Sequence, residues 1–347
     1  MRAVVIDEVG VEPTVQDVPD PTCPPGGAVL DVAATGVCRS DWHVLAGHDP
    51  VTLPHVPGHE LVGTIREVGE GVTRWRVGDR VTTPFVCGCG RCALCAAGES
   101  QVCPDQRQPG FSDWGSYAEQ VALHAADHNI VAVPETMRDE TAAALGCRFA
   151  TSYRAVAQHG GVRADQWVAV HGAGGAGLSA VLVAKALGAR AVVVDLAPAA
   201  LERATALGVD AAIDGRGLDP AAIAAAVHEV TDGGAHVSID AFGSPAAATA
   251  SVLSLRRRGR HVQVGLLFGD AAQIPLPMDR IIAWELAVHG SHGLAAADYP
   301  VMLDLVTRAG IDLDTLVGRV VGLDEAPAAL ASLGETPASA GVTVIRP

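Results

Sequence analysis

The stretch WVAVHGAGGAG, residues 167–177, decides the fold of this chain of 347 residues. Its apolar first half is typical of a buried strand, its glycines follow the spacing G-x-G-x-x-G, and a helical pattern continues over 175–188. A second apolar strand pattern occupies 189–195. Because glycines in a strand–turn–helix let a pyrophosphate approach the backbone at a helix N-terminus, the segment predicts a dinucleotide-binding unit. The residues predicted to bind the cofactor here are Gly172, Gly174, Gly175, Gly177 and Asp195.

The carboxylate of Asp195 also indicates which dinucleotide is bound. At the end of the second strand it can accept hydrogen bonds from the adenosine ribose diol, and it would repel a 2′-phosphate. The sequence therefore favours NAD over NADP. Two other interpretations stay open from these residues alone: an ordinary tight turn with an exposed Asp195, and FAD, which the same type of loop also binds.

Outward from this unit, strands and helices alternate. Apolar strand patterns lie at 236–243 and 261–266, and Ala-rich helical patterns lie at 197–207 and 219–230. Such alternation predicts an α/β fold with a parallel sheet covered on both faces.

The first third of the chain has a different texture. Its strand patterns, at 28–38, 61–69 and 78–85, are separated by many prolines and glycines, and the change to alternating helices and strands comes near residue 141. A closing strand pattern ends the chain at 341–347. Since the length also suggests about two domains, we expect a β-rich domain beside the α/β domain.

The charge balance excludes two classes of partner. Lys and Arg total 24 against 39 Asp and Glu, a formal net charge of -15, whereas nucleic acids and anionic membranes attract basic surfaces. The arginine-rich run SLRRRGR, 254–260, is therefore interpreted as a solvated turn between a helix and a strand. The uncharged stretch 167–184 contains a histidine and several glycines, which make it a poor lipid-facing helix. The N-terminus shows no secretory pattern, so we expect a soluble, cytoplasmic protein.

Four of the eight cysteines form a dense cluster. The segment PFVCGCGRCALCAAGESQVC, 84–103, holds cysteines in the spacing C-x2-C-x2-C-x7-C, and four thiolates on one short lobe can bind zinc tetrahedrally. Buried or redox thiols and an iron–sulfur cluster are the alternatives that spacing alone leaves open. Cys87 lies two residues before Cys89 and makes the first ligand ambiguous.

Three further fragments carry candidate catalytic side chains: GVCRSDWH at 36–43, VPGHE at 56–60 and ALGCRFATSY at 144–153. Together with the cysteine lobe and the glycine loop, in this order, they resemble the zinc-containing medium-chain alcohol dehydrogenases over essentially the whole chain. The resemblance implies a GroES-like, β-rich catalytic domain formed by 1–148 and 292–347, with a structural-zinc lobe at about 86–104. It implies a Rossmann domain, a doubly wound parallel sheet that binds NAD, at 149–291.

The same resemblance implies two zinc ions per chain. The implied ligands of the catalytic zinc are Cys38, His59 and Cys147. The implied ligands of the structural zinc are Cys89, Cys92, Cys95 and Cys103, which leaves Cys23 and Cys87 without a role. Glu60 would sit behind the catalytic metal, and Asp41 would orient His59. Ser40 would take the proton of the alcohol, and His43 would pass it to solvent.

Cofactor and substrate contacts are implied as well. Arg39 matches a pyrophosphate contact, and Thr151 matches a residue beside the nicotinamide. The candidate walls of the substrate pocket are Phe85, Trp42, Trp114 and His292. Two family features are missing, because Ala200 stands where a basic residue is common and Val342 where an arginine often follows the glycine.

The resemblance implies an NAD(P)-dependent alcohol dehydrogenase that reversibly oxidises a primary or secondary alcohol to an aldehyde or ketone, with hydride transfer to NAD. A polyol or threonine-type zinc dehydrogenase is the main alternative, although such enzymes often have a carboxylate at the position of Cys147. A zinc-free quinone or enoyl reductase and a non-catalytic nucleotide-binding protein fit less well, because neither needs the three ligands and the relay. A homotetramer is expected, with a homodimer as the alternative.

Overall fold

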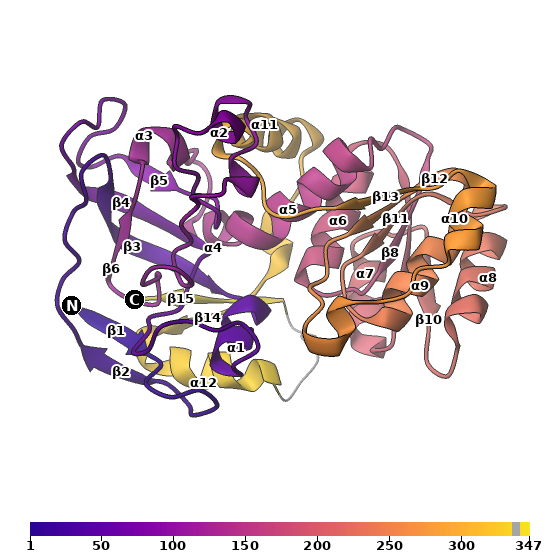
Figure 1. The fold of residues 1–347 in the computed structure, drawn as a ribbon, viewed down its shortest axis with the longest axis horizontal. Coiled ribbons are helices and arrows are strands. Elements are labelled where there is room, and N and C mark those ends of the chain that lie inside the picture. The colour runs from indigo at the N-terminus through magenta and orange to yellow at the C-terminus, as the bar shows by residue number, and fades with distance from the viewer. Residues whose placement is uncertain (335–340) are drawn as a thin grey trace.

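The computed structural model describes residues 1–334 and 341–347. Two β-sheets occupy opposite halves of the molecule, and both chain termini lie in the half that holds the mixed sheet (Figure 1). The helical stretch that includes α5 lies between the two halves (Figure 1). The predicted combination of a β-rich unit and an α/β unit is therefore confirmed.

The parallel sheet has six strands in the order β10-β9-β8-β11-β12-β13. Its strands are β8 (Trp167–His171), β9 (Arg190–Asp195), β10 (Ala211–Asp214), β11 (Ala235–Asp240), β12 (Leu255–Gln263) and β13 (Ala287–Gly290). Its helices are α6 (Gly175–Ala186), α7 (Pro198–Ala206), α8 (Pro220–Thr231), α9 (Pro245–Leu253) and α10 (Met278–Trp284). The order reverses beside β8, so the carboxyl end of β8, where the glycine loop begins, lies at the crevice where such sheets bind ligands.

Alternate residues of these strands enter different cores. Val168 and Val170 pack in one cluster with residues of α6, whereas Ala169 packs in another with Val227 of α8. The sheet is thus covered on both faces, which explains why its strands read as continuous apolar runs. The interpretation of 254–260 as a turn is wrong. After α9 ends at Leu253, β12 begins at Leu255. The register of its pairing with β11 shifts between Leu255 and Arg260, and the exposed arginines lie at this irregularity.

The second half of the molecule contains a mixed sheet in the order β14-β15-β3-β4-β5-β7, with β6 paired to β3, and a separate β1–β2 hairpin. Its strands are β1 (Arg2–Val5), β2 (Thr14–Asp17), β3 (Ala28–Val37), β4 (Leu61–Val68), β5 (Arg80–Thr82), β6 (Gln120–Leu123), β7 (Val131–Ala132), β14 (Val317–Gly322) and β15 (Val342–Arg346). The remaining helices are α1 (Arg39–Leu45), α2 (Ala93–Ala96), α3 (Ala126–Asn129), α4 (Asp139–Ala143), α5 (Ala150–Tyr153), α11 (Tyr299–Ala309) and α12 (Ala326–Ala331).

Helix α4 continues through two π-helical turns, at Leu145–Phe149 and Arg154–His159, that flank α5. A π-turn inserts an extra residue into a helix and is frequent at functional sites. Here the first π-turn contains Cys147. In the part of the chain that the structure describes, no helix has the length and apolar character needed to cross a bilayer.

Candidate active site and zinc centres

Cys38, His59 and Cys147 come together although they lie far apart in the sequence. Cys38 directly follows β3 and caps α1, His59 lies two residues before β4, and Cys147 lies in the π-turn after α4. Their ligand atoms all lie within 4.8 Å of one another. A hydrogen bond with Cys147, aided by the charge of Arg148, lowers the pKa of the Cys38 thiol well below its usual value. The set therefore has the two sulfur donors and one nitrogen donor that suit zinc.

Asp41 fixes the ring of His59. One carboxylate oxygen, Oδ1, lies 2.9 Å from Nδ1 of His59 and accepts the N–H of Gly58 at 3.0 Å. The other oxygen accepts the N–H of Cys38 at 3.2 Å and the hydroxyl of Tyr117 at 3.1 Å. Asp41 is completely buried, and these four hydrogen bonds offset the free-energy cost of removing its charge from water.

The second ring nitrogen of His59 is available to bind a metal. Nε2 of His59 is buried and has no hydrogen-bond partner among the described residues. Buried polar atoms almost always have a partner, so an unpartnered nitrogen between two thiols fits a metal ligand. The side chains present thus fit the zinc ion that the family resemblance implies, and its binding here stays a prediction.

Glu60 and Arg148 form a buried ion pair behind this set. Arg148 donates to Glu60 through Nη2 and, at 3.1 Å, through its backbone N–H, and its Nη2 also donates to the carbonyl of Val37 at 2.6 Å. Burial raises the pKa of Glu60 to about 7, against the opposing charge of Arg148. A Cβ at Gly36 would lie 2.5 Å from Oε2 of Glu60, so the strand has to carry glycine there.

Arg148 is a site residue that the motif reasoning missed, although it follows Cys147 directly. A Cβ at Gly175 would lie 2.5 Å from Cδ of Arg148, so the arginine packs against the start of α6. One side chain therefore contacts both the neighbourhood of the metal set and the glycine loop.

The glycine loop has the geometry of an anion-binding turn. Gly172 has a φ of +98°, and a Cβ at Gly177 would lie 1.8 Å from the carbonyl oxygen of Gly172. Gly174 is the N-cap of α6 and offers no side chain, so the first N–H groups of the helix are free of a side-chain cap. Asp195 accepts the N–H of Ala173 at 2.6 Å, which holds its carboxylate beside the loop.

Other predicted cofactor residues lie around this loop. Thr151 is buried in α5, which packs against α6, and Arg39 is exposed at the start of α1 with its guanidinium 5.5 Å from the ring of Trp42. Ala200 is buried in α7, so no side chain reaches from that position toward Asp195.

The predicted relay residues lie on α1. Ser40 accepts a weak hydrogen bond from the Cys38 thiol, with 3.8 Å between oxygen and sulfur. His43 is half-buried one turn further along α1, and burial lowers its pKa to about 4. No hydrogen bond joins Ser40 directly to His43 among the described residues, so a proton passing between them needs a bound hydroxyl group.

The predicted pocket walls fall into two groups. Phe85 lies 5.9 Å from the ring of His59 and 5.1 Å, edge to face, from His292, measured between ring centroids. Phe111 lies 5.1 Å from the ring of His59, measured in the same way. Trp114 and Phe111 line a cavity of about 660 Å³ next to Val51. Trp42 instead packs with Arg39 and His43.

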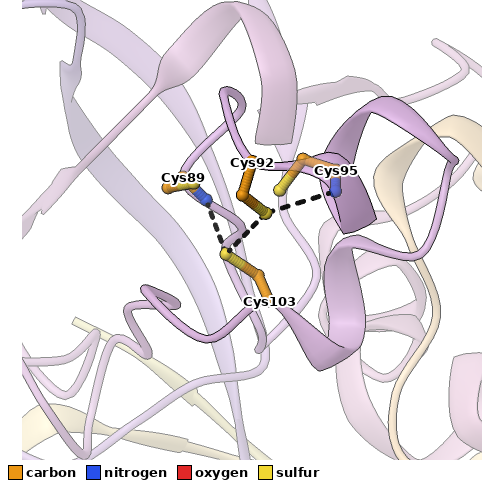
Figure 2. A group of neighbouring side chains, drawn as sticks. All are labelled: Cys89, Cys92, Cys95 and Cys103. Atoms are coloured by element: carbon orange, nitrogen blue, oxygen red, sulfur yellow. Dashed lines mark hydrogen bonds between the residues drawn. The ribbon is translucent and has the colours of Figure 1, made fainter.

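Figure 2 shows the second donor set, in which the four cysteines of the lobe point toward one another. Sγ of Cys92 and Sγ of Cys103 lie 3.7 Å apart, and these sulfurs accept the backbone N–H groups of Cys95 at 3.4 Å and Cys89 at 3.3 Å. Such N–H···S bonds stabilise thiolates, and the closed set fits a structural zinc.

Cys87 lies outside this set. Its thiol contacts the hydroxyl of Thr83 at 3.3 Å, and its sulfur is not one of the four that lie within 4.8 Å of one another. The amide of Asn129 clasps the lobe at Gly88, accepting its N–H and donating to its carbonyl, both at 2.9 Å.

A parallel sheet of the kind that binds dinucleotides, combined with two groups of side chains suited to bind zinc, defines a zinc-dependent oxidoreductase. Two family models match the chain: the alcohol dehydrogenase GroES-like domain over residues 24–135, and the zinc-binding dehydrogenase over residues 175–308. The chain belongs to the zinc-dependent medium-chain alcohol dehydrogenase family, and the resemblance found in the sequence is confirmed.

Individual relatives agree with this assignment. The chain is 38% identical over 294 residues to an alcohol dehydrogenase of Geobacillus stearothermophilus, covering 84% of each chain. It is 35% identical over 330 residues to a sorbitol dehydrogenase of Halalkalibacterium halodurans, covering 94% of each. A solved alcohol dehydrogenase, TADH from Thermus sp. ATN1, matches with a TM-score of 0.90 at 29% identity, over 100% of this chain and 99% of that one. The protein is thus an oxidoreductase of the alcohol and polyol dehydrogenase type.

Proposed function

We propose that this protein is an NAD-dependent, zinc-dependent dehydrogenase that interconverts a primary or secondary alcohol and its aldehyde or ketone. The observation that carries the proposal is the Cys38, His59 and Cys147 set with the unpartnered Nε2 of His59. In this assignment the lobe cysteines hold a second, structural zinc. The catalytic domain comprises 1–148 and 292–347, and the Rossmann domain comprises 149–291.

When bound, zinc supplies a Lewis acid for the alcohol oxygen and NAD supplies the hydride acceptor. The residues of the chain position these groups and move the proton. Asp41 keeps Nδ1 of His59 protonated, so that Nε2 is the nitrogen free to bind the metal. Ser40 accepts the hydroxyl proton of the substrate as it gives up its own proton to a bound hydroxyl group, that group gives its proton to His43, and His43 releases a proton toward solvent. Phe85 and Phe111 exclude water around the reacting carbon.

The cofactor assignment depends on Asp195. Its carboxylate already accepts the N–H groups of Ala173 and Ala197, at 2.6 Å and 2.8 Å, at the end of β9. A fixed negative charge there favours a ribose diol over a 2′-phosphate, which supports NAD as the preferred cofactor. We also propose a homotetramer and a cytoplasmic location, in line with the expectations from the sequence.

A polyol is the second candidate substrate, favoured by the similarity to a sorbitol dehydrogenase. The cavity beside Phe111 and Trp114 is lined by Val51, Pro50 and Pro54 and also by the polar side chains of Thr52, His55, Ser112 and Asp113, so its mixed wall fits a polyol as well as a simple alcohol. Initial rates with primary, secondary and aromatic alcohols and with sorbitol, each with NAD and with NADP, test the proposal. Faster turnover of sorbitol than of every simple alcohol would contradict it.

A further inference from the structure

A second histidine lies against His43 on its solvent side. Nδ1 of His48 is 3.0 Å from Nδ1 of His43, and His48 is exposed whereas His43 is half-buried. None of the motifs that define the active site includes His48. Because the proposed proton route ends at His43, a group that hydrogen-bonds to this ring affects both its tautomer and its charge.

The contact between the two rings follows from the way α1 ends. The N–H of Gly47 donates to the carbonyl of Val44 at 3.0 Å, and the N–H of His48 donates to the carbonyl of His43 at 2.9 Å. Gly47 has a φ of +74°. These are the two bonds of a Schellman motif, which places the side chains of its first and last residues against each other. The backbone therefore brings His43 and His48 together.

Neighbouring aromatic side chains enclose the pair. The ring of Trp42 lies 5.2 Å from that of His43 and 5.5 Å from that of His48, edge to face in both cases. Phe268, from the loop after β12 in the other half of the molecule, lies 4.5 Å from His43 and 6.2 Å from His48. Both imidazoles are thus restricted in orientation.

A hydrogen bond between two Nδ1 atoms needs one shared proton. When His43 is the donor, its Nε2 keeps a lone pair and can accept a proton. Burial, together with the charges of His48 and Arg39, disfavours the cationic form of His43 and lowers its pKa. A neutral His48 that accepts the Nδ1–H acts in the opposite direction, because a hydrogen bond from the charged form favours that form.

We propose that His48 is a positioning residue for proton release: it accepts the Nδ1–H of His43, fixes the tautomer whose Nε2 takes the proton, and stabilises the resulting imidazolium. The proton arrives at Nε2 of His43 and leaves from the same atom to water, so the N–H bond shared with His48 stays intact. In the reducing direction the same bond holds the imidazolium that returns the proton. The inference rests on the proposed function.

Two substitutions separate this role from packing. His48→Leu keeps an apolar side chain against Trp42 and Phe268 but removes the acceptor. His48→Asn places a side-chain oxygen near the position of Nδ1. We expect His48→Leu to lower kcat/KM for the alcohol about tenfold, the low end for a hydrogen bond to a charged group, and His48→Asn to restore most of it. The Kd for NAD should change less than about twofold in both variants.

A His43→Ala background distinguishes failure of this inference from failure of the proposed function. There His48→Leu should cause no further loss, because its effect acts through His43. An equal loss in both backgrounds, or no rescue by His48→Asn, would overturn the role of His48. Full activity of His43→Ala itself would overturn the proton route and the inference with it.

The tautomer is also observable without turnover. In ¹⁵N-histidine-labelled protein, two-dimensional NMR distinguishes a protonated from an unprotonated ring nitrogen, and His43→Ala identifies the signals. We expect Nδ1 of His43 to be protonated in the wild type and His48→Asn, and the tautomer to change in His48→Leu. An unprotonated Nδ1 of His43 in the wild type would overturn the proposal.

Discussion

Tyr117 is the outermost support of the metal set, and Tyr117→Phe tests that support with the loss of a single hydroxyl. Tyr117 is fully buried, and its hydroxyl donates to Asp41 at 3.1 Å and lies 3.3 Å from the carbonyl of Gly36. A hydrogen bond to a charged group contributes about 1.5–3 kcal/mol. The variant should therefore lose about 2 kcal/mol of unfolding free energy.

Zinc affinity should fall in the same variant. Removing a partner of a metal-bound histidine typically costs 10–100-fold in affinity. Tyr117 acts one step further away, through Asp41, which keeps three other donors, so we expect a loss of about tenfold. Because Asp41 orients His59, the weaker carboxylate leaves Nε2 less well aligned for the metal.

The assays are urea unfolding of the zinc-free protein and zinc competition against a chromogenic chelator. The matched control is Tyr299→Phe, since Tyr299 is equally buried but donates to the neutral carbonyl of Gly146, at 3.1 Å. That variant should lose about 1 kcal/mol. Equal destabilisation by both substitutions, with zinc affinity unchanged in Tyr117→Phe, would refute the reasoning.

Three further predictions concern the other half of the molecule. Burial lowers the pKa of His171 to about 3 and of His261 to about 4, so both side chains are neutral in the folded protein. The free energy of unfolding should therefore fall as pH drops from about 6.5 toward 4, by about 1.4 kcal/mol per pH unit for each histidine. In thermal unfolding, His261→Asn should make the stability less dependent on pH over this range. Gly177→Ala, whose Cβ would strike the carbonyl of Gly172, should abolish NAD binding in calorimetry while zinc content is retained. Asp195→Ser should raise kcat/KM with NADP relative to NAD at least tenfold, and an unchanged ratio would remove Asp195 from the recognition of the ribose.

Local motifs made much of the fold predictable. The glycine loop and Asp195 lie within one strand–turn–helix–strand, and the four lobe cysteines lie within one short segment, so each group is close in space because it is close in sequence. The family resemblance was needed to choose Cys89 over Cys87 as the first ligand. The charge of the run 254–260 favours a solvated turn, whereas its place between α9 and the core makes it the start of a sheet strand with exposed arginines.

Contacts between distant residues could not be predicted in the same way. Tyr117 reaches Asp41 only because the mixed sheet brings their segments together, and no spacing rule connects them. Arg148 follows Cys147 directly, so its place near the site could be predicted from the sequence. Its ion pair with Glu60 could not, because it depends on the π-turn. His48 contacts His43 through the end of α1, where Gly47 with its positive φ is the sequence feature that marks the turn.

The central claim is that Cys38 belongs to a catalytic zinc site distinct from the structural one. Zinc content and alcohol oxidation with NAD, measured together for the wild type, Cys38→Ser and the buried bystander control Cys87→Ser, test it most directly. We predict two zinc ions per chain and full turnover for the wild type and Cys87→Ser, and one zinc ion with no turnover for Cys38→Ser, while its NAD binding is retained. Full turnover by Cys38→Ser with two zinc ions bound would contradict the account.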